Sequence, residues 1–260
     1  MLCKEVMSVI EESYPRDCAL NWDNVGLLAG RDDKEVKRIY VALDADDDVV
    51  ETAVRIHADM LITHHPLIFS GMKRITSEDF TGRRLLGLIQ NDISYYAMHT
   101  NYDVRGMAAL ACERLGMPDS LVLEVTRVSE DGTEEGIGRI ADLDPVTLCN
   151  LCERVKKAFG LDTVRLFGDQ TQMIRRAAIC PGSGKSVIGQ ALKKGADVLI
   201  TGDIGHHEGI DAVAEGMAVI DAGHYGIEHI FIQDMKNYLE EYLRDVEIEA
   251  ASVRHPFTVL

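Results

Sequence analysis

Short apolar runs alternate with segments of helical periodicity along most of the chain. In the first part, a helical pattern over about residues 2–13 precedes the apolar run Arg38–Asp44, a second helical pattern over about 47–57 and the apolar run 60–63. Apolar runs that alternate with helical patterns are typical of α/β architecture. We therefore expect an α/β protein.

The same order of patterns returns in the second part of the chain. The strand Arg176–Cys180 is followed by a Gly-rich turn, a helical pattern over about 185–194 and the strand 197–201. A further strand, Met217–Asp221, precedes the helical pattern Ile227–Leu243. The sequence thus predicts two lobes built from a duplicated α/β unit.

The stretch between the two copies has a weaker pattern. It contains several glycines and a predicted helix that Asp144 and Pro145 open and that ends near Phe159 and Gly160. We interpret it as a connector without a large inserted domain. The predicted organisation is a first lobe at 1–120, the connector at 121–175 and a second lobe at 176–260, with the lobes interlocked as one unit.

Composition narrows the classes of protein that fit this pattern. At 260 residues and 46% hydrophobic, the chain can bury one large core or two lobes. Its net charge of −16 argues against an extended nucleic-acid surface. Lys4 and Glu5 interrupt what would be the apolar core of a signal peptide, and no apolar run approaches the roughly 20 residues of a membrane span. We expect a cytoplasmic protein.

The six cysteines are scattered, which makes a poor disulfide framework for a chain of this length. Cys149 and Cys152 form a lone Cys-x-x-Cys pair, and no second pair follows to complete a zinc site. We expect the cysteines to be reduced and structural.

A nearly identical apolar run occurs twice, and histidines follow each copy. The matching segments are Ala58–Thr63 followed by His64 and His65, and Ala196–Thr201 followed by His206 and His207. Further on, an alanine, a histidine and a carboxylate recur at the same spacings, as Ala97-x-His99-x-x-x-Asp103 and Ala222-x-His224-x-x-x-Glu228. Packing alone does not require this order twice, so we interpret the repeat as a duplicated metal-binding half.

The placement of these residues suits a dinuclear metal site. Sites in open α/β sheets lie beyond the carboxyl ends of the strands, where His64 and His65 follow such a strand. Pro66 keeps His65 extended, and side chains of adjacent extended residues point in opposite directions, which favours two neighbouring metals. If the last helix has begun by His224, this residue and Glu228 share one helical face.

The predicted ligands combine imidazole and carboxylate groups: His64, His65, Asp103, His224 and Glu228. Such ligands suit Zn, Fe, Mn or Co and exclude a soft thiolate site. Five ligands for two divalent ions leave positions open for water, as a catalytic metal requires. We therefore predict a metal-dependent hydrolase, and full coordination by protein groups would instead favour a non-catalytic or regulatory scaffold.

Other residues are candidates for proton transfer and phosphate binding. His99, His206 and His207 would either transfer protons or orient the metal ligands through hydrogen bonds. The candidate phosphate contacts, for which solvated surface is the other interpretation, are Lys73, Arg74, Arg105 and Lys185. The Gly-rich turn Pro181–Ser186 ends like a P-loop, but Ile179 stands where that motif needs its first glycine.

Four segments together resemble the Nif3-like family of dinuclear-metal proteins. They are Asn21–Leu27, Ile62–Phe69, His99–Asp103 and Gly223–Glu228. Members are described as homologues of the type 2 form of GTP cyclohydrolase I. For Trp22, in the first of these segments, we favour a packing role against the first lobe over a role in the site.

The resemblance implies that the five predicted ligands bind two divalent metals. It also implies an α/β fold of two lobes with mixed sheets and the metal site between the lobes, ring-like homohexamers, and no inserted domain in a connector this short. GTP cyclohydrolase activity, attributed to some members, would require attack of water at C8 of the guanine and release of formate. The expected substrate is a nucleotide or another phosphorylated small molecule, and opening of the GTP ring is the most specific form of this prediction.

Overall fold

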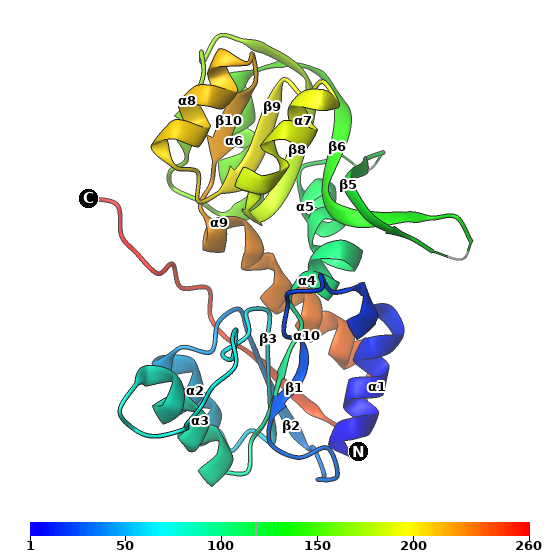
Figure 1. Ribbon diagram of the computed structural model, residues 1–260, viewed down its shortest axis with the longest axis vertical. Helices are drawn as coiled ribbons and strands as arrows, with labels where there is room; N and C mark the ends of the chain where they lie inside the picture. The colour runs from blue at the N-terminus through cyan, green and yellow to red at the C-terminus, as the bar shows by residue number, and fades with distance from the viewer. Residues whose placement is uncertain (118, 130) are drawn as a thin grey trace. The chain divides into compact units, whose positions relative to one another are not determined.

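The computed structural model describes residues 1–117, 119–129 and 131–260. The chain divides into two compact units, each built around its own mixed β-sheet (Figure 1). Unit 1 comprises residues 1–102 and 231–254, and unit 2 comprises residues 103–230 and 255–260. Within the described part of the chain, none of the helices combines the length and apolarity that a bilayer span requires.

Unit 1 contains a five-stranded sheet in the order β1-β4-β3-β2-β11. Its strands are β1 (Gly26–Ala29), β2 (Arg38–Ala42), β3 (Met60–Thr63), β4 (Ser94–Ala97) and β11 (Glu247–Ala250). Strand β1 is antiparallel to β4, whereas the other neighbours are parallel. The helical segments of this unit are α1 (Cys3–Ser13), η1 (Arg16–Cys18), α2 (Asp47–Arg55), α3 (Phe80–Gln90), α4 (Thr100–Tyr102) and most of α10 (Ile230–Tyr242).

Helices cover both faces of this sheet. Val50 of α2 and Leu88 of α3 pack with Leu61 and Tyr95 of the sheet in one buried cluster. Figure 1 shows α1 and α10 on the opposite side of the sheet from α2 and α3. This three-layer arrangement buries both faces of the parallel strands, which explains why those strands are continuous apolar runs in the sequence.

Unit 2 contains a six-stranded sheet in the order β5-β6-β8-β9-β10-β7. Its strands are β5 (Leu121–Val128), β6 (Glu134–Thr147), β7 (Arg165–Phe167), β8 (Met173–Ser183), β9 (Val198–Gly202) and β10 (Ala218–Asp221). Strands β8, β9 and β10 are parallel, β6 and β7 are antiparallel to them, and β5 is antiparallel to β6. The helical segments are η2 (Asp103–Met107), α5 (Ala108–Arg114), α6 (Leu148–Phe159), η3 (Gly184–Val187), α7 (Ile188–Lys193), α8 (His206–Ala214) and α9 (His224–Glu228).

The two sheets confirm the predicted α/β class with mixed sheets. The unit boundaries differ from the expected division at 1–120, 121–175 and 176–260, because unit 1 ends at residue 102 and takes up 231–254. The expected connector supplies β5, β6, β7 and α6 to unit 2.

The start of helix α6 also differs from the prediction. Asp144 and Pro145 lie in β6, and the helix begins at Leu148. Thr147 is its N-cap, and the Thr147 side chain accepts a hydrogen bond from the Asn150 amide (3.3 Å). The cap residue therefore defines the helix start here. Pro145 lies in the last part of the long strand β6, where its pairing with β8 shifts register between Asp142 and Val146.

The two parallel strand trios, β2-β3-β4 and β8-β9-β10, share a specific hydrogen-bond pattern. Oδ2 of Asp59, just before β3, accepts from the amides of Lys37 and Arg38 (2.8 and 3.0 Å). Oδ2 of Asp197, just before β9, accepts from the amides of Arg175 and Arg176 (2.7 and 2.9 Å). The shared pattern agrees with the duplication predicted from the repeated apolar run.

Candidate metal centre

Three histidines of unit 1 gather at the carboxyl ends of two neighbouring parallel strands. His64 and His65 directly follow β3, and His99 follows β4. One ring nitrogen from each histidine lies within 4.8 Å of the others, which makes the three a group that could hold a metal ion. His64 is fully buried, and the other two rings are partly exposed.

The prediction that His64 and His65 point in opposite directions is wrong. Their ring centroids are 4.9 Å apart with the planes tilted by 47°. The strand ends at Thr63, and the chain bends through the two histidines, where the Thr63 hydroxyl donates to the His65 carbonyl (2.7 Å). The alternation of an extended strand therefore does not apply to this pair.

Both rings are held by a hydrogen bond at Nδ1. His64 Nδ1 donates to the Met98 carbonyl oxygen (2.9 Å), and His65 Nδ1 donates to Oδ1 of Asp44 (2.7 Å). These acceptors fix the proton on Nδ1, so in a neutral ring the lone pair is on Nε2. Metal-ligating histidines in proteins usually show this arrangement, in which the second nitrogen donates to a carboxylate or carbonyl.

His99 is held by a buried carboxylate. Its Nδ1 donates to Oδ1 of Asp23 (2.9 Å), and Oδ2 of Asp23 accepts from the Thr100 amide (2.9 Å) and hydroxyl. Burial raises the pKa of Asp23, but the hydrogen bonds from His99 and Thr100 outweigh it and lower the pKa to about 2. Asp23 is therefore a carboxylate at neutral pH and an acceptor for the His99 ring.

Unit 2 carries a histidine and a carboxylate on one short helix. His224 begins α9, Glu228 ends it, and His224 Nε2 lies 2.9 Å from Glu228 Oε2. The predicted pairing of these two residues on one helical face is confirmed. His224 Nδ1 donates to Oδ2 of Asp203 (2.8 Å), so this ring shows the same Nδ1 anchoring as the histidines of unit 1.

A glycine makes room for the Glu228 carboxylate. Gly182, in β8, has a φ of +74°, and a Cβ built on it would overlap with Glu228 Oε1 and lie 3.5 Å from His224 Nε2. The side chain of Glu228 is therefore packed against backbone at a position where only glycine fits. The Gly-rich turn noted in the sequence, which does not match a P-loop, thus leaves space for the Glu228 carboxylate.

The second predicted carboxylate lies in the same region of unit 2. Burial raises the pKa of the Cys180 thiol, and the negative charges of Asp103, Glu228 and Glu124 raise it further. Asp103 begins η2, a π-helical turn, and such turns occur often at functional sites. Unit 2 thus concentrates carboxylate charge around a neutral thiol, as a cation site requires.

His206 and His207 do not match His64 and His65 in the fold. The carbonyl oxygens of Thr63 and Thr201 each accept a hydrogen bond from the residue that follows the neighbouring parallel strand, so the two threonines are equivalent. Gly202 and Asp203 therefore occupy the positions that His64 and His65 hold in unit 1. His206 and His207 are exposed at the start of α8, and none of the donor groups found among the described residues includes them.

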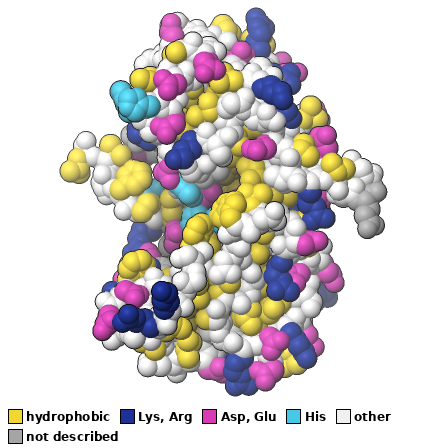
Figure 2. Space-filling view, in the orientation of Figure 1, with side chains coloured by type: hydrophobic (Ala, Val, Ile, Leu, Met, Phe, Trp, Pro, Cys, Tyr) yellow, Lys and Arg dark blue, Asp and Glu magenta, His cyan; other side chains and the backbone are white. Residues whose placement is uncertain are grey.

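The four candidate phosphate contacts are surface residues. Lys73, Arg74 and Lys185 are exposed, and Arg105 forms an ion pair with Glu135. On the face drawn in Figure 2, Lys and Arg side chains are interspersed with Asp and Glu and form no continuous basic patch among the described residues. These observations favour the interpretation of each of these residues as part of the solvated surface.

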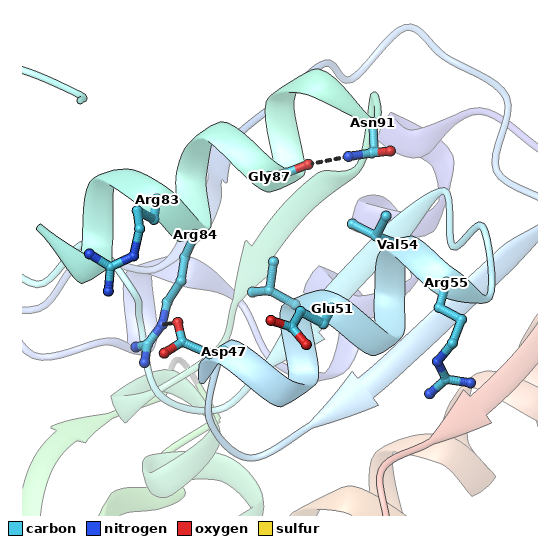
Figure 3. A pocket seen from close by; sticks show the side chains of 9 residues that line it. Asp47, Glu51, Val54, Arg55, Arg83, Arg84, Gly87 and Asn91 are labelled. Atoms are coloured by element: carbon cyan, nitrogen blue, oxygen red, sulfur yellow. Dashed lines mark hydrogen bonds and ion pairs between the residues drawn. The ribbon is translucent and has the colours of Figure 1, made fainter. Parts of the chain in front are cut away.

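A pocket lies between α2 and α3 of unit 1 (Figure 3). Its charged lining includes Arg84, which pairs with Asp47 (2.7 Å), together with Glu51, Arg55 and Arg83. No histidine lines it, and its lining mixes acidic and basic groups. The candidate chemistry is therefore elsewhere in this unit, at the strand ends.

Sequence reasoning missed three carboxylates, the acceptors for the histidine rings: Asp23, Asp44 and Asp203. Asp44 and Asp203 each follow the end of an apolar strand, which is the signal that could have identified them. Asp23 lies in a loop, 76 residues from His99 in the sequence, and only its place beside Trp22 in the resembling segment pointed to it.

Comparison with known sequences identifies relatives over the whole chain. The family model described as Duf34/NIF3 (NGG1p interacting factor 3) matches residues 1–256. The GTP cyclohydrolase 1 type 2 homolog of Streptococcus pneumoniae is 37% identical over 94% of this chain and 92% of its own length. The homolog of Clostridium perfringens with the same name is 33% identical over 99% of both chains.

Solved structures show the same fold. A Bacillus cereus protein related to NIF3 superposes with a TM-score of 0.94 at 26% identity, over 100% of this chain and 99% of that one. Reduced HcgD from Methanocaldococcus jannaschii gives a TM-score of 0.81 at 30% identity, over 96% and 97% of the two chains. The sequence match, the fold and the histidine and carboxylate groups agree, and the chain belongs to the DUF34/NIF3 family.

Proposed function

We propose that this protein is a hydrolase that binds two divalent metal ions and acts on a nucleotide or another phosphorylated small molecule. The proposed ligands are His64, His65, Asp103, His224 and Glu228. Imidazole and carboxylate donors suit Zn, Fe, Mn or Co. The observation that carries the proposal is the shared anchoring of four rings, each of which donates from Nδ1 to a carboxylate or carbonyl: His64, His65, His99 and His224.

Both proposed carboxylate ligands are close in the sequence to aromatic residues that pack near His64. The Tyr102 ring lies 6.0 Å from the His64 ring, and Asp103 is the next residue. The Phe231 ring lies 5.3 Å from the His64 ring, and Glu228 precedes Phe231 by three positions. The proposed ligands therefore come from segments that adjoin one another along the chain.

The residues of the chain have distinct proposed roles. When bound, the ions supply Lewis-acid chemistry and make water acidic enough to provide a nucleophile near neutral pH. His99, held by the Asp23 carboxylate, has its lone pair on Nε2 and is placed to accept a proton there. Asp103 and Glu228 offset the positive charge of the ions.

GTP is the first substrate to test, because the relatives at 33–37% identity carry the name GTP cyclohydrolase 1 type 2 homolog. The proposal predicts release of formate from GTP that stops when the metal is removed and returns when it is restored. Glu228→Gln should abolish it, whereas the exposed Glu113→Gln on α5 should not. Unchanged turnover after metal removal would contradict the proposal, and bound metal without turnover of GTP or other phosphorylated substrates would favour the scaffold role.

We also propose that the chain assembles into a ring-like homohexamer, as its family resemblance implies. Light scattering should then give a mass of six 28.8 kDa chains. A mass of one chain at working concentration would exclude this assembly.

A further inference from the structure

Two large aromatic side chains are exposed next to the histidines of unit 1. Trp22 and Phe69 each expose 57% of their surface, although they come from segments far apart in the sequence. Their ring centroids are 5.7 Å apart with the planes tilted by 44°. Exposed aromatic pairs of this kind are unfavourable in water and often mark a binding site.

Both rings contact a histidine of the candidate donor group. The Trp22 centroid lies 6.0 Å from that of His99, and the Phe69 centroid lies 6.4 Å from it, with edge-on geometry in both cases. His99 in turn belongs to the group with His64 and His65. The exposed pair therefore borders the residues to which the proposed chemistry is assigned.

Hydrogen bonds hold the backbone that carries the two rings. Asp23, next to Trp22, bonds His99 and Thr100, and the Leu20 amide donates to the Thr100 hydroxyl (2.9 Å). The Asn24 side-chain amide donates to the carbonyl oxygen of Ile68, next to Phe69 (2.6 Å). The loop of Trp22 is thus tied both to the histidine and to the loop of Phe69, so the exposure of the rings is a fixed feature.

We propose that Trp22 and Phe69 stack against a planar heteroaromatic ring of the substrate, which makes the substrate a nucleotide or nucleoside and not a phosphorylated sugar. This inference rests on the proposed function for the identity of the site. Aromatic side chains bind nucleobases through their faces without reading sequence, and the contact carries no charge. Because the chain has a net charge of −16, it repels an anionic substrate, and an uncharged stacking contact can bind the substrate without being weakened by that repulsion.

Trp22 is the single tryptophan of the chain, so its fluorescence reports on the pair directly. Guanosine, GTP and ribose 5-phosphate are titrated into the full-length protein, with and without metal. We expect quenching by guanosine and GTP, also without metal, and none by ribose 5-phosphate. Equal responses to ribose 5-phosphate, or no response to any of the three, would overturn the inference.

Substitutions identify the ring that binds. Phe69→Ala should weaken guanosine binding about tenfold, and Phe69→Tyr should restore it. Phe80→Ala is the matched control, because Phe80 is 56% exposed on α3 and packs under Arg84. An effect of Phe80→Ala equal to that of Phe69→Ala would contradict a specific platform.

The outcomes separate this inference from the proposed function. Guanosine binding without metal-dependent hydrolysis keeps the aromatic platform and removes the hydrolase. Metal-dependent hydrolysis with no change in Trp22 fluorescence would keep the hydrolase and remove the aromatic platform. Fluorescence that depends on protein concentration and not on nucleoside would show that a second copy of the chain covers Trp22 and Phe69, which overturns the inference.

Discussion

The ends of strands β3 and β9 occupy equivalent positions in the two sheets but carry different groups. After β3, the chain bends and presents the rings of His64 and His65. At the end of β9, the equivalent positions hold Gly202, the last residue of the strand, and Asp203. A Cβ at position 202 would overlap with the backbone amide of His224, so the start of α9 packs directly on the end of β9.

The difference shows how duplicated units acquire different donors. In unit 1, the residues that follow the middle strand supply the imidazoles themselves. In unit 2, the corresponding position is a glycine, and the helix that passes over it supplies His224 and Glu228. Which residue carries the chemistry therefore depends on what packs over the strand end, and repeated sequence positions do not identify it.

The largest expected effect comes from a change that makes the second strand end resemble the first. Gly202→Ala places a Cβ against backbone that cannot move independently of α9. We expect a loss of about 3 kcal/mol in the free energy of unfolding, at the upper end of overpacking effects. Chemical denaturation measures it. Gly189→Ala, in open space on α7, should instead stabilise the protein by about 0.5–1 kcal/mol, and equal losses in both variants would refute the steric argument.

Gly182→Ala tests whether the donor pair of unit 2 depends on its glycine. The added methyl group would displace the Glu228 carboxylate, so we expect metal affinity to fall about 100-fold, the upper range for groups that orient ligands. Competition with a chelator measures the affinity. Gly195→Ala is the control for backbone strain, since its φ of +73° is nearly the same and nothing lies near its Cβ. Normal metal affinity in Gly182→Ala would contradict the role of the cradle.

The carboxylates that accept hydrogen bonds from His99 and His224 differ in their exposure to solvent. Asp23 is fully buried behind His99, whereas the Asp203 side chain behind His224 is 58% exposed. We expect Asp23→Asn to lower activity at least about tenfold, and Asp203→Asn to have a smaller effect, because water can replace an exposed acceptor. Steady-state kinetics on the two variants provides the test. A larger loss in Asp203→Asn would show that burial does not decide the strength of the anchor.

The smallest difference between the units is expected at the paired aspartates. Asp59 and Asp197 each accept two backbone amides, so alanine at either position should cost a similar amount, about 1–3 kcal/mol. Thermal or chemical unfolding of the two variants gives the comparison. A clear inequality would mean that the shared hydrogen-bond pattern hides different local packing.

Much of the fold was readable from the sequence because its signals are local. The apolar runs became β3 (Met60–Thr63) and β9 (Val198–Gly202), and the spacing of His224 and Glu228 gave their shared helical face. The assignment of 231–254 to unit 1 was not readable, because it depends on the long-range pairing of β11 with β2.

The details of the site were less accessible for the same reason. Hydrogen bonds across 21 or more residues join His65 to Asp44 and His99 to Asp23, and no periodicity encodes them. The packing role assigned to Trp22 did not anticipate a ring that is 57% exposed. The opposite orientation expected for His64 and His65 failed because the strand ends at Thr63 and the chain bends at both histidines.

The most direct test of the account is the metal content of each chain, measured by elemental analysis on the purified full-length protein. We expect two divalent ions per chain, with a clear loss in His64→Gln and in Glu228→Gln, one variant from each unit. His57→Asn, an exposed histidine with a positive φ that asparagine tolerates, should keep both ions. Fewer than one ion per chain in the wild type, or unchanged metal content in both ligand variants, would contradict the central claim.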